Sequence, residues 1–533
     1  MKRLTIVGAV VILLPVLFLL QQLFIPTTEN WATIQTYLLP AYVTQTVVLG
    51  ASVVLTTVII GGSFAWLITA YDFPLRRLFS WALLLPLAIP PYIGGFTYSS
   101  MLSYTGILQK TLRNTFGIEI DQRYLDILSL PGAVVMFTLF LMPYVYVITR
   151  AFLLRQPGSL FESAQLLGRG SIGIWLTVAI PIARPALAGG GALVLYEVLS
   201  DYGLTHYFGV QTFTTAIFQT WFGLYDIASA VRLAAMLMLG VLGVVVLEKR
   251  LRKARYVAVA QPRALVAKRL VGVKGWLAFV ACGVLVAVGF LFPVMQQLQW
   301  AIWTYADVEW RALLHYAANT VWLAGLAAIV AVVIAMPVAN VARERSVVWR
   351  LMPKIYGIGY TVPGAIVSIG VLVLFLTLDD GARWWTSVFD AGGTSFVFSL
   401  SIFMLGFGYV IRFIGIAIGP IEAGYEKLGS RFTESARMLG ATKWRAFTRV
   451  ELPLLRGAFI GSFTITFVEM VKELPMTLLL RPFNFHTLAT RTYQFASDER
   501  IQEASIPCLA LIGVSLLSVT LLYRLGGEQH ERS

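Results

Sequence analysis

Two stretches of the chain are copies of each other, separated by a constant offset. Residues 162–181 read ESAQLLGRGSIGIWLTVAIP, and residues 434–453 read ESARMLGATKWRAFTRVELP. The recurring residues are Glu162, Ser163, Ala164, Leu167, Gly168 and Pro181 in the first copy and Glu434, Ser435, Ala436, Leu439, Gly440 and Pro453 in the second. Beyond these stretches the same offset relates Arg184 to Arg456 and Glu197 to Glu469. Because the offset is about half of the chain, we infer two homologous halves.

Each copy has the pattern of a short helix, a glycine and a second short helix, followed by a proline before the next apolar run. Apolar residues recur at helical spacing in the first helix of each copy: Leu160, Ala164 and Leu167, then Phe432, Ala436 and Leu439. Ser159, three residues before Glu162, predicts a capping box. Gly168 and Gly440 predict the helix ends, since glycine adopts the left-handed backbone conformation at little cost.

This repeated element is too polar to cross a bilayer and too apolar on one side to be a free loop. We therefore predict that it is a docking element for a partner protein. An amphipathic helix lying on the lipid surface is the alternative, but it does not explain why two copies occupy matched positions in the halves.

The composition places the chain in a membrane. Hydrophobic residues make up 58% of the chain, charged residues 13%, and the mean hydropathy is +0.77, which lies outside the soluble range. Apolar runs of about 20 residues, enough to cross a bilayer, are predicted at 4–24, 43–70, 78–104, 131–154, 183–205 and 228–248, then at 273–297, 317–340, 352–377, 395–418, 456–478 and 503–525. The predicted fold is an all-α polytopic membrane protein with two six-helix halves.

The distribution of basic residues predicts the orientation. Lys and Arg are enriched on the cytoplasmic side of membrane proteins. A cytoplasmic N-terminus puts most of the 41 Lys and Arg residues inside, together with the C-terminus and both repeated loops, 155–182 and 419–455. The predicted division is a first half at 1–248, a basic cytoplasmic linker at 249–274 and a second half at 275–533. The first span lacks a small-residue cleavage site, so we interpret it as an uncleaved anchor.

Helix breakers interrupt one span at nearly the same position of each half. They are Pro86, Pro90 and Pro91 in the first half and Gly359, Pro363 and Gly364 in the second. Irregular backbone at membrane depth must be buried in protein or line a cavity, and paired broken helices indicate a translocation pathway. For any single proline, a packing kink is the alternative.

Four acidic residues follow the repeated loops within predicted spans. Glu197 and Asp201 are matched by Glu469 and Glu473, and each pair lies on one helical face. A carboxylate at the bilayer centre costs roughly 2.5–3.5 kcal/mol, so these acids should face a bundle interior or a water-filled cavity. They either line a substrate path or form hydrogen bonds that fix the halves together, and Lys472 can reach Glu469 to neutralise it.

Several functions are disfavoured by what the sequence lacks. It contains no phosphate-binding G-x-x-x-x-G-K-[ST] motif, and its four histidines have no metal-ligand spacing. No basic stripe with interleaved aromatic residues indicates nucleic-acid binding. Cys282 and Cys508 lie in apolar runs, which disfavours a disulfide. We therefore expect no enzyme activity, no cofactor and no stable metal site in this chain, and an energy source outside it.

The repeated stretch resembles the EAA loop of the permeases of binding-protein-dependent ABC importers, in which Glu-Ser/Ala-Ala is followed by a glycine and a proline. Residues 200–226 and 471–500 are similar to stretches of the fused ferric-iron permeases of that family. The resemblance implies a bacterial inner-membrane protein that binds two ATPase subunits through Glu162, Ala164, Gly168, Pro181, Glu434, Ala436, Gly440 and Pro453. It also implies a periplasmic binding protein that delivers ferric iron. Thiamine or another small solute is the alternative substrate, and an ion-coupled secondary transporter is the alternative class.

Overall fold

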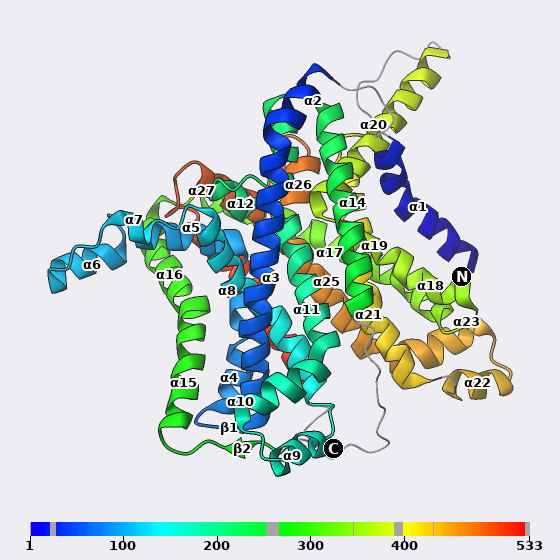
Figure 1. Ribbon diagram of the computed structural model, residues 1–533. Helices are drawn as coiled ribbons and strands as arrows, with labels where there is room; N and C mark the ends of the chain where they lie inside the picture. The colour runs from blue at the N-terminus through cyan, green and yellow to red at the C-terminus, as the bar shows by residue number, and fades with distance from the viewer. Residues whose placement is uncertain are drawn as a thin grey trace.

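The computed structural model describes residues 2–21, 28–251, 266–344, 346–388, 398–429 and 431–527. These residues are almost entirely helical (Figure 1). The elements up to residue 251 are α1 (Lys2–Gln21), α2 (Glu29–Thr33), η2 (Ile34–Leu38), α3 (Leu39–Ala70), β1 (Tyr71–Asp72), α4 (Arg76–Ala82), η3 (Leu85–Ala88), α5 (Pro91–Leu102), α6 (Ile107–Phe116), α7 (Gln122–Leu125), α8 (Leu130–Leu153), α9 (Gly158–Leu166), α10 (Ser171–Ile174), η4 (Trp175–Ala179), α11 (Ile180–Ser200), α12 (Gly203–Tyr207), α13 (Phe213–Phe218), η5 (Gln219–Gly223) and α14 (Ile227–Leu251).

The elements after residue 265 repeat much of this order. They are β2 (Lys268–Arg269), α15 (Val273–Val286), η6 (Ala287–Leu291), α16 (Phe292–Thr304), η7 (Tyr305–Asp307), α17 (Trp310–Ala342), α18 (Val347–Tyr356), α19 (Ile358–Thr361), α20 (Gly364–Val388), α21 (Ile402–Leu428), α22 (Arg431–Met438), α23 (Lys443–Ala446), η8 (Phe447–Glu451), α24 (Leu452–Leu454), α25 (Arg456–Lys472), α26 (Pro475–Leu480), α27 (Leu488–Ser497) and α28 (Ser505–Gly527). The long helices α3, α8 and α11 correspond to α17, α21 and α24–α25.

The predicted all-α polytopic fold is confirmed. Among the described residues, nine helices are long and apolar enough to cross a membrane, or up to eleven if two bent pairs each count as one span. The bent pairs are 76–88 with 91–116, at 89°, and 444–454 with 456–472, at 70°. The last predicted span, 503–525, falls in α28, where the apolar stretch measured is the shorter Ser505–Leu517.

We call the elements up to residue 251 the first set and those after residue 265 the second set. The first helix of each set packs against elements of the other set. The Tyr356 hydroxyl on α18 donates to the Thr5 carbonyl on α1, at 2.9 Å, and α1 runs beside α18 and α20 in Figure 1. In the opposite direction, Gln297 Nε2 on α16 donates to Thr97 Oγ1 on α5, at 2.7 Å. This exchange interlocks the two sets, and one apolar core cluster contains residues of both.

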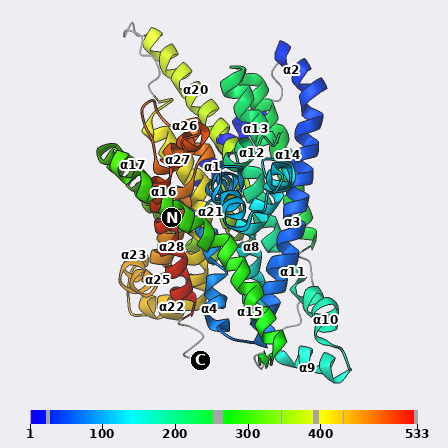
Figure 2. The same ribbon diagram turned by 90° about the vertical axis from the view of Figure 1, so that its left-hand side faces the viewer.

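The described part of the linker pairs with residues of the first set. Lys268 and Arg269 pair in parallel with Tyr71 and Asp72 as a two-residue ladder. Most of the predicted linker lies outside the described residues. The ladder fixes the entry to α15, which then runs diagonally across the view of Figure 2.

Candidate functional site

The helix breaks of both sets meet around one cavity of about 100 Å³. The first set contributes the break between η3 and α5 and the break between α11 and α12; the second contributes the break between α25 and α26, together with α19 and α21. The cavity is lined by Leu87, Ile89, Pro90, Pro91, Tyr92, Phe137, Phe140, Leu141, Tyr144, Glu197, Ser200, Asp201, Gly203, Tyr360, Arg412, Phe413, Glu469, Lys472, Glu473, Leu474 and Pro475. Broken helices at matching positions therefore enclose a polar space between the sets.

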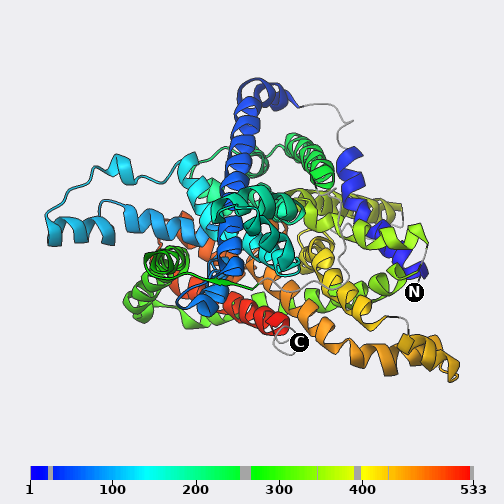
Figure 3. The same ribbon diagram turned by 60° about the horizontal axis from the view of Figure 1, so that its bottom comes forward.

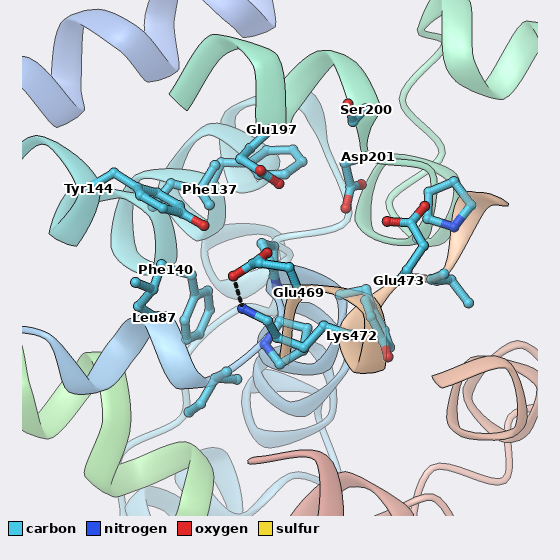
Figure 4. A pocket seen from close by; sticks show the side chains of 18 of the residues that line it. Leu87, Phe137, Phe140, Tyr144, Glu197, Ser200, Asp201, Glu469, Lys472 and Glu473 are labelled. Carbon is cyan, nitrogen blue, oxygen red and sulfur yellow. Dashed lines mark hydrogen bonds and ion pairs between the residues drawn. The ribbon is translucent and has the colours of Figure 1, made fainter. Parts of the chain in front are cut away.

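All four predicted membrane acids line this cavity (Figure 4). Glu197 Oε1 accepts a hydrogen bond from the Tyr360 hydroxyl of the other set, at 3.1 Å. Glu469 Oε1 lies 2.9 Å from Lys472 Nζ, the pairing that their spacing predicted. The two acids of the first set and the two acids of the second set therefore lie around the same cavity.

Asp201 and Glu473 also have a local structural role. Asp201 Oδ1 accepts from the backbone N–H groups of Leu204 and Thr205, at 2.9 and 3.1 Å. Glu473 Oε1 accepts from the backbone N–H of Met476, at 3.1 Å. Each acid therefore satisfies free N–H groups at the start of a short helix, α12 or α26, and holds that helix at the cavity.

Sequence reasoning missed Arg412, which brings a positive charge into the cavity. Its Nε lies 3.4 Å from Glu473 Oε2, and both side chains are buried. Arg412 occupies the repeat position of Phe140, so a search for features shared by both halves passes over it. The signal was present nonetheless, because an arginine inside a predicted span is rare and functional by default.

The break before α20 allows this close packing. A Cβ atom on Gly364 would lie 2.6 Å from Arg412 Nη1 and 2.9 Å from Glu473 Oε1. A side chain at this position would therefore require the ends of Arg412 and Glu473 to shift. Gly364 is one of the three breakers that the sequence singled out in the second half.

The cavity contains more acidic than basic side chains. Four carboxylates face two cationic side chains, Arg412 and Lys472. Within the described residues, no three His, Cys, Asp or Glu side chains are placed to hold one metal ion.

An aromatic cluster from α12, α13 and α27 adjoins the cavity. The Tyr493 hydroxyl lies 2.7 Å from His206 Nδ1 of the other set. Tyr202 stacks on Phe218 with ring centroids 3.8 Å apart and lies 5.7 Å from the Tyr493 ring. Tyr92 contacts Tyr493 and also lines the cavity, so the cluster borders it directly.

The two repeated loops fold alike. Gly168 and Gly440 have φ of +79° and +85°, the left-handed conformation predicted for both. After Gly168 the Arg169 N–H donates to Ala164 O at 3.1 Å, and after Gly440 the Ala441 N–H donates to Ala436 O at 3.0 Å. Each first helix thus ends in the same Schellman arrangement. Pro181 and Pro453 lie in the first turns of α11 and α24.

The predicted capping box at Ser159 is wrong. Helix α9 begins at Gly158 with Pro157 before it and without a side-chain cap, so Ser159 lies inside the first turn and cannot serve as the cap. The predicted apolar face is only partly buried: Ala164 is 7% exposed but Leu167 is 84% exposed. Helix α9 instead packs through Phe161.

The last residues of both helices are exposed and apolar. Leu166 is the last residue of α9 and Leu167 follows it; Met438 and Leu439 hold the same positions at the end of α22. All four side chains are more than four-fifths exposed. Glu162 and Glu434 are also exposed. The two loops lie at the lower end of the molecule on opposite sides in Figure 2, and α22 and α23 project outward in Figure 3.

Comparison with known proteins finds similarity to one family of membrane proteins. Residues 329–527 match the family described as "Binding-protein-dependent transport system inner membrane component". The match lies within the second half of this chain and includes the second repeated loop. The family resemblance of the repeated loops is thereby confirmed, and the chain is a multi-pass membrane protein.

Individual permeases are similar to different extents. The Fe(3+)-transport system permease protein FbpB 2 of Haemophilus influenzae is 24% identical over 485 residues, covering 90% of this chain and 88% of the relative. The maltose/maltodextrin permease protein MalG of Escherichia coli K12 is 29% identical over 122 residues, 22% of this chain and 40% of MalG. The molybdenum permease protein ModB of the same strain is 28% identical over 142 residues, 27% of this chain and 59% of ModB.

Proposed function

We propose that this chain is the fused permease subunit of an ABC importer that moves ferric iron into the cytoplasm. Residues 1–248 and 275–533 would be its two halves. A periplasmic binding protein delivers the iron, and two copies of a separate ATPase subunit bind the loops 155–182 and 419–455. The observation that carries this proposal is the acid-rich cavity between matched broken helices, at the interface of the halves.

The acidic side chains of the cavity favour a cation over maltose, maltodextrin or a molybdenum compound, the substrates in the names of the relatives with shorter matches. Ferric iron is a hard cation that prefers oxygen ligands, and four carboxylates surround the space. Neither a neutral sugar nor a molybdenum oxyanion offers the positive charge that carboxylate oxygens bind. The relative that matches 90% of this chain is named for Fe(3+) transport, which supports the same choice. Because shorter stretches also match permeases for maltose and molybdenum, another small solute such as thiamine is the alternative substrate.

The loops support docking of an ATPase. We call α9 and α22 the loop helices. Each presents an exposed glutamate and an exposed apolar pair at its end, and exposed apolar groups at matched positions indicate a protein interface. An ion-coupled secondary transporter has no need of two matching elements of this kind.

The docking test uses Glu434→Arg and Gly440→Pro in the second loop and the equivalent changes at Glu162 and Gly168. We expect the protein to insert normally but to lose ATP-driven uptake and co-purification of the ATPase subunit. Glu422→Gln serves as the control, because Glu422 lies on α21 near the same loop helix. Uptake that survives the changes in both loops would refute docking.

The substrate test uses Glu197→Gln in reconstituted vesicles that contain the ATPase and binding protein. Glu197 is the most informative acid, since it accepts a hydrogen bond from the Tyr360 hydroxyl and an amide at this position keeps that contact. We expect strongly slowed iron uptake with unchanged ATPase binding. Wild-type uptake by the variant would assign the acid a structural role, and vesicles that transport thiamine or another solute but never iron would refute the substrate.

A further inference from the structure

The two loop helices are attached to the membrane helices by different chemistry. In the first half, the Phe161 side chain of α9 is 1% exposed. Its ring lies 5.2 Å from that of Trp66 on α3, and Trp66 stacks on Trp175 at 5.7 Å. Contacts between aromatic rings therefore hold α9 against α3.

In the second half, a buried carboxylate takes the place of this aromatic cluster. Thr433 of α22, at the repeat position of Phe161, donates its hydroxyl to Glu451 Oε1 at 2.7 Å. Glu451 occupies the repeat position of Ala179 and is 2% exposed. At equivalent positions, apolar contacts therefore attach α9 and polar contacts attach α22.

Three further donors surround the Glu451 carboxylate. Asn340 Nδ2 donates to Oε2 at 3.0 Å, and the Tyr425 hydroxyl donates to Oε2 at 3.3 Å. Arg343 Nη1 lies 3.4 Å from Oε1, and its Nη2 donates to the Gly429 carbonyl at 2.5 Å. One side chain thus joins α22 to the end of α17 and to the end of α21.

Helix α22 depends on this network because it has little other attachment. None of its described residues is buried, and an open cleft of about 560 Å³ lies beside it, lined by Thr433, Glu434, Arg437 and Glu451. Hydrogen bonds to a charged group are stronger than neutral ones, so a short helix with no buried face can still be held at a fixed angle.

We propose that Glu451 is a positioning residue that transmits movement of α22 to α17 and α21, whereas movement of α9 passes through Phe161 and Trp66 to α3. This inference rests on the proposed function, in which the loop helices bind ATPase subunits. It assigns the two halves different mechanical connections: a hydrogen-bonded one beside an open cleft in the second half and an apolar one in the first.

The test uses Thr433→Val, which keeps the shape of the side chain but removes the donor to Glu451, with Thr433→Ser as the matched control. The complete transporter is reconstituted with its ATPase subunits and binding protein, and ATP hydrolysis stimulated by the binding protein is measured with solute uptake. Because a hydrogen bond to a charged group is lost, we expect both rates to fall about tenfold in the valine variant. The serine variant should retain wild-type rates, and both should bind the ATPase subunit normally.

Glu451→Gln provides a second measurement if the valine variant inserts poorly. The double variant Thr433→Val/Glu451→Gln should be no slower than the slower single variant, because both changes break the same connection. Wild-type rates in Thr433→Val and in Glu451→Gln, or losses that add in the double variant, would overturn the proposal. Loss of ATPase binding by Thr433→Val alone would also overturn it, by making the residue part of the docking surface. Failure of the wild-type chain to bind any ATPase subunit would instead refute the proposed function.

Discussion

At the scale of single residues, the cavity depends on a buried ion pair that only one half possesses. Arg412 and Glu473 are 4% and 7% exposed, and each has further partners: Arg412 Nη1 donates to Val362 O at 3.3 Å, and Glu473 caps α26. A buried pair contributes little net stability, but breaking it leaves an uncompensated charge.

Glu473→Gln should therefore destabilise the protein by about 3–5 kcal/mol, since Arg412 would remain buried without its partner. The double variant Arg412→Phe/Glu473→Gln, which places the first-half residue at the repeat position, should recover most of this loss. Thermal unfolding of the purified protein in detergent measures both. A double variant less stable than Glu473→Gln would contradict the argument.

Asp226 offers a pH-dependent test at the start of α14. Its Oδ2 accepts from the Thr28 hydroxyl at 2.6 Å and its Oδ1 from the Ser229 N–H at 3.0 Å. Burial acts to raise the pKa of Asp226, but these hydrogen bonds and that of the Ser229 hydroxyl outweigh it, so the pKa is lowered. A lowered pKa stabilises the fold above the unfolded value, about 3.9 for Asp, and this contribution is lost as the pH falls through the folded value.

Asp226→Ala should thus cost about 1 kcal/mol at neutral pH, as expected for a lost helix cap. The difference between variant and wild type should begin to shrink below pH about 4, where the carboxylate of the unfolded chain becomes protonated, and should be lost as the pH falls through the lowered pKa of the folded state. Unfolding measured across the acidic range checks this. A difference that stays constant down to the lowest pH would contradict a role for the charge.

At the scale of elements, the helix break before α20 sets how closely two helices approach. A Cβ atom on Gly359 of α19 would lie 2.1 Å from the Ile411 carbonyl oxygen of α21. Because this neighbour is backbone, a side chain can be accommodated only if one helix moves. Arg412 follows Ile411, so such a movement would also shift the ion pair.

Gly359→Ala should lower stability by roughly 1–3 kcal/mol, as overpacking in a tight core does. Gly419→Ala is the matched control on α21, since a Cβ atom there meets nothing within 4 Å and alanine favours a helix over glycine. Thermal unfolding separates the two. Equal stability of both variants would contradict the close approach of α19 and α21.

At the scale of the whole molecule, the exchanged first helices interlock the halves. Helix α1 packs on α18 and α20 of the second half, while α15 packs on α4 of the first half and α16 lies between α5 of the first half and α28 of the second. The two interlocked halves therefore share one apolar core cluster.

The proposed orientation is tested by cysteine labelling. Gln165 and Arg437 lie on exposed parts of the loop helices, Tyr124 is 84% exposed on α7, and the native Cys282 and Cys508 are fully buried. A membrane-impermeant maleimide should label Tyr124→Cys in intact cells, and should label Gln165→Cys and Arg437→Cys only after the inner face is exposed. The reverse pattern would overturn the orientation and, with it, docking of ATPase subunits at the loops.

The sequence alone determined the features that depend on neighbours along the chain. The repeat predicted matching elements, and the glycines predicted where α9 and α22 end. The shared helix faces predicted from the i, i+4 spacing of the acids were wrong, because α11 ends at Ser200 and α25 ends at Lys472. Asp201 and Glu473 therefore lie in the breaks that follow these helices and not on the helices themselves. Hydropathy predicted most of the spans, because the bilayer sets the length of an apolar run. The capping box at Ser159 failed because helix boundaries shift by a residue or two without changing the pattern.

The tertiary structure alone decided which elements meet. Periodicity reports the face of one helix but not its partner, so it could not show that α1 packs on the second half or that Tyr360 reaches Glu197. Arg412 and Glu451 were missed for a related reason: each breaks the repeat, replacing Phe140 and Ala179 of the first half. The roles of these two residues depend on partners brought together by packing between distant segments, which the spacing of residues along the chain does not encode.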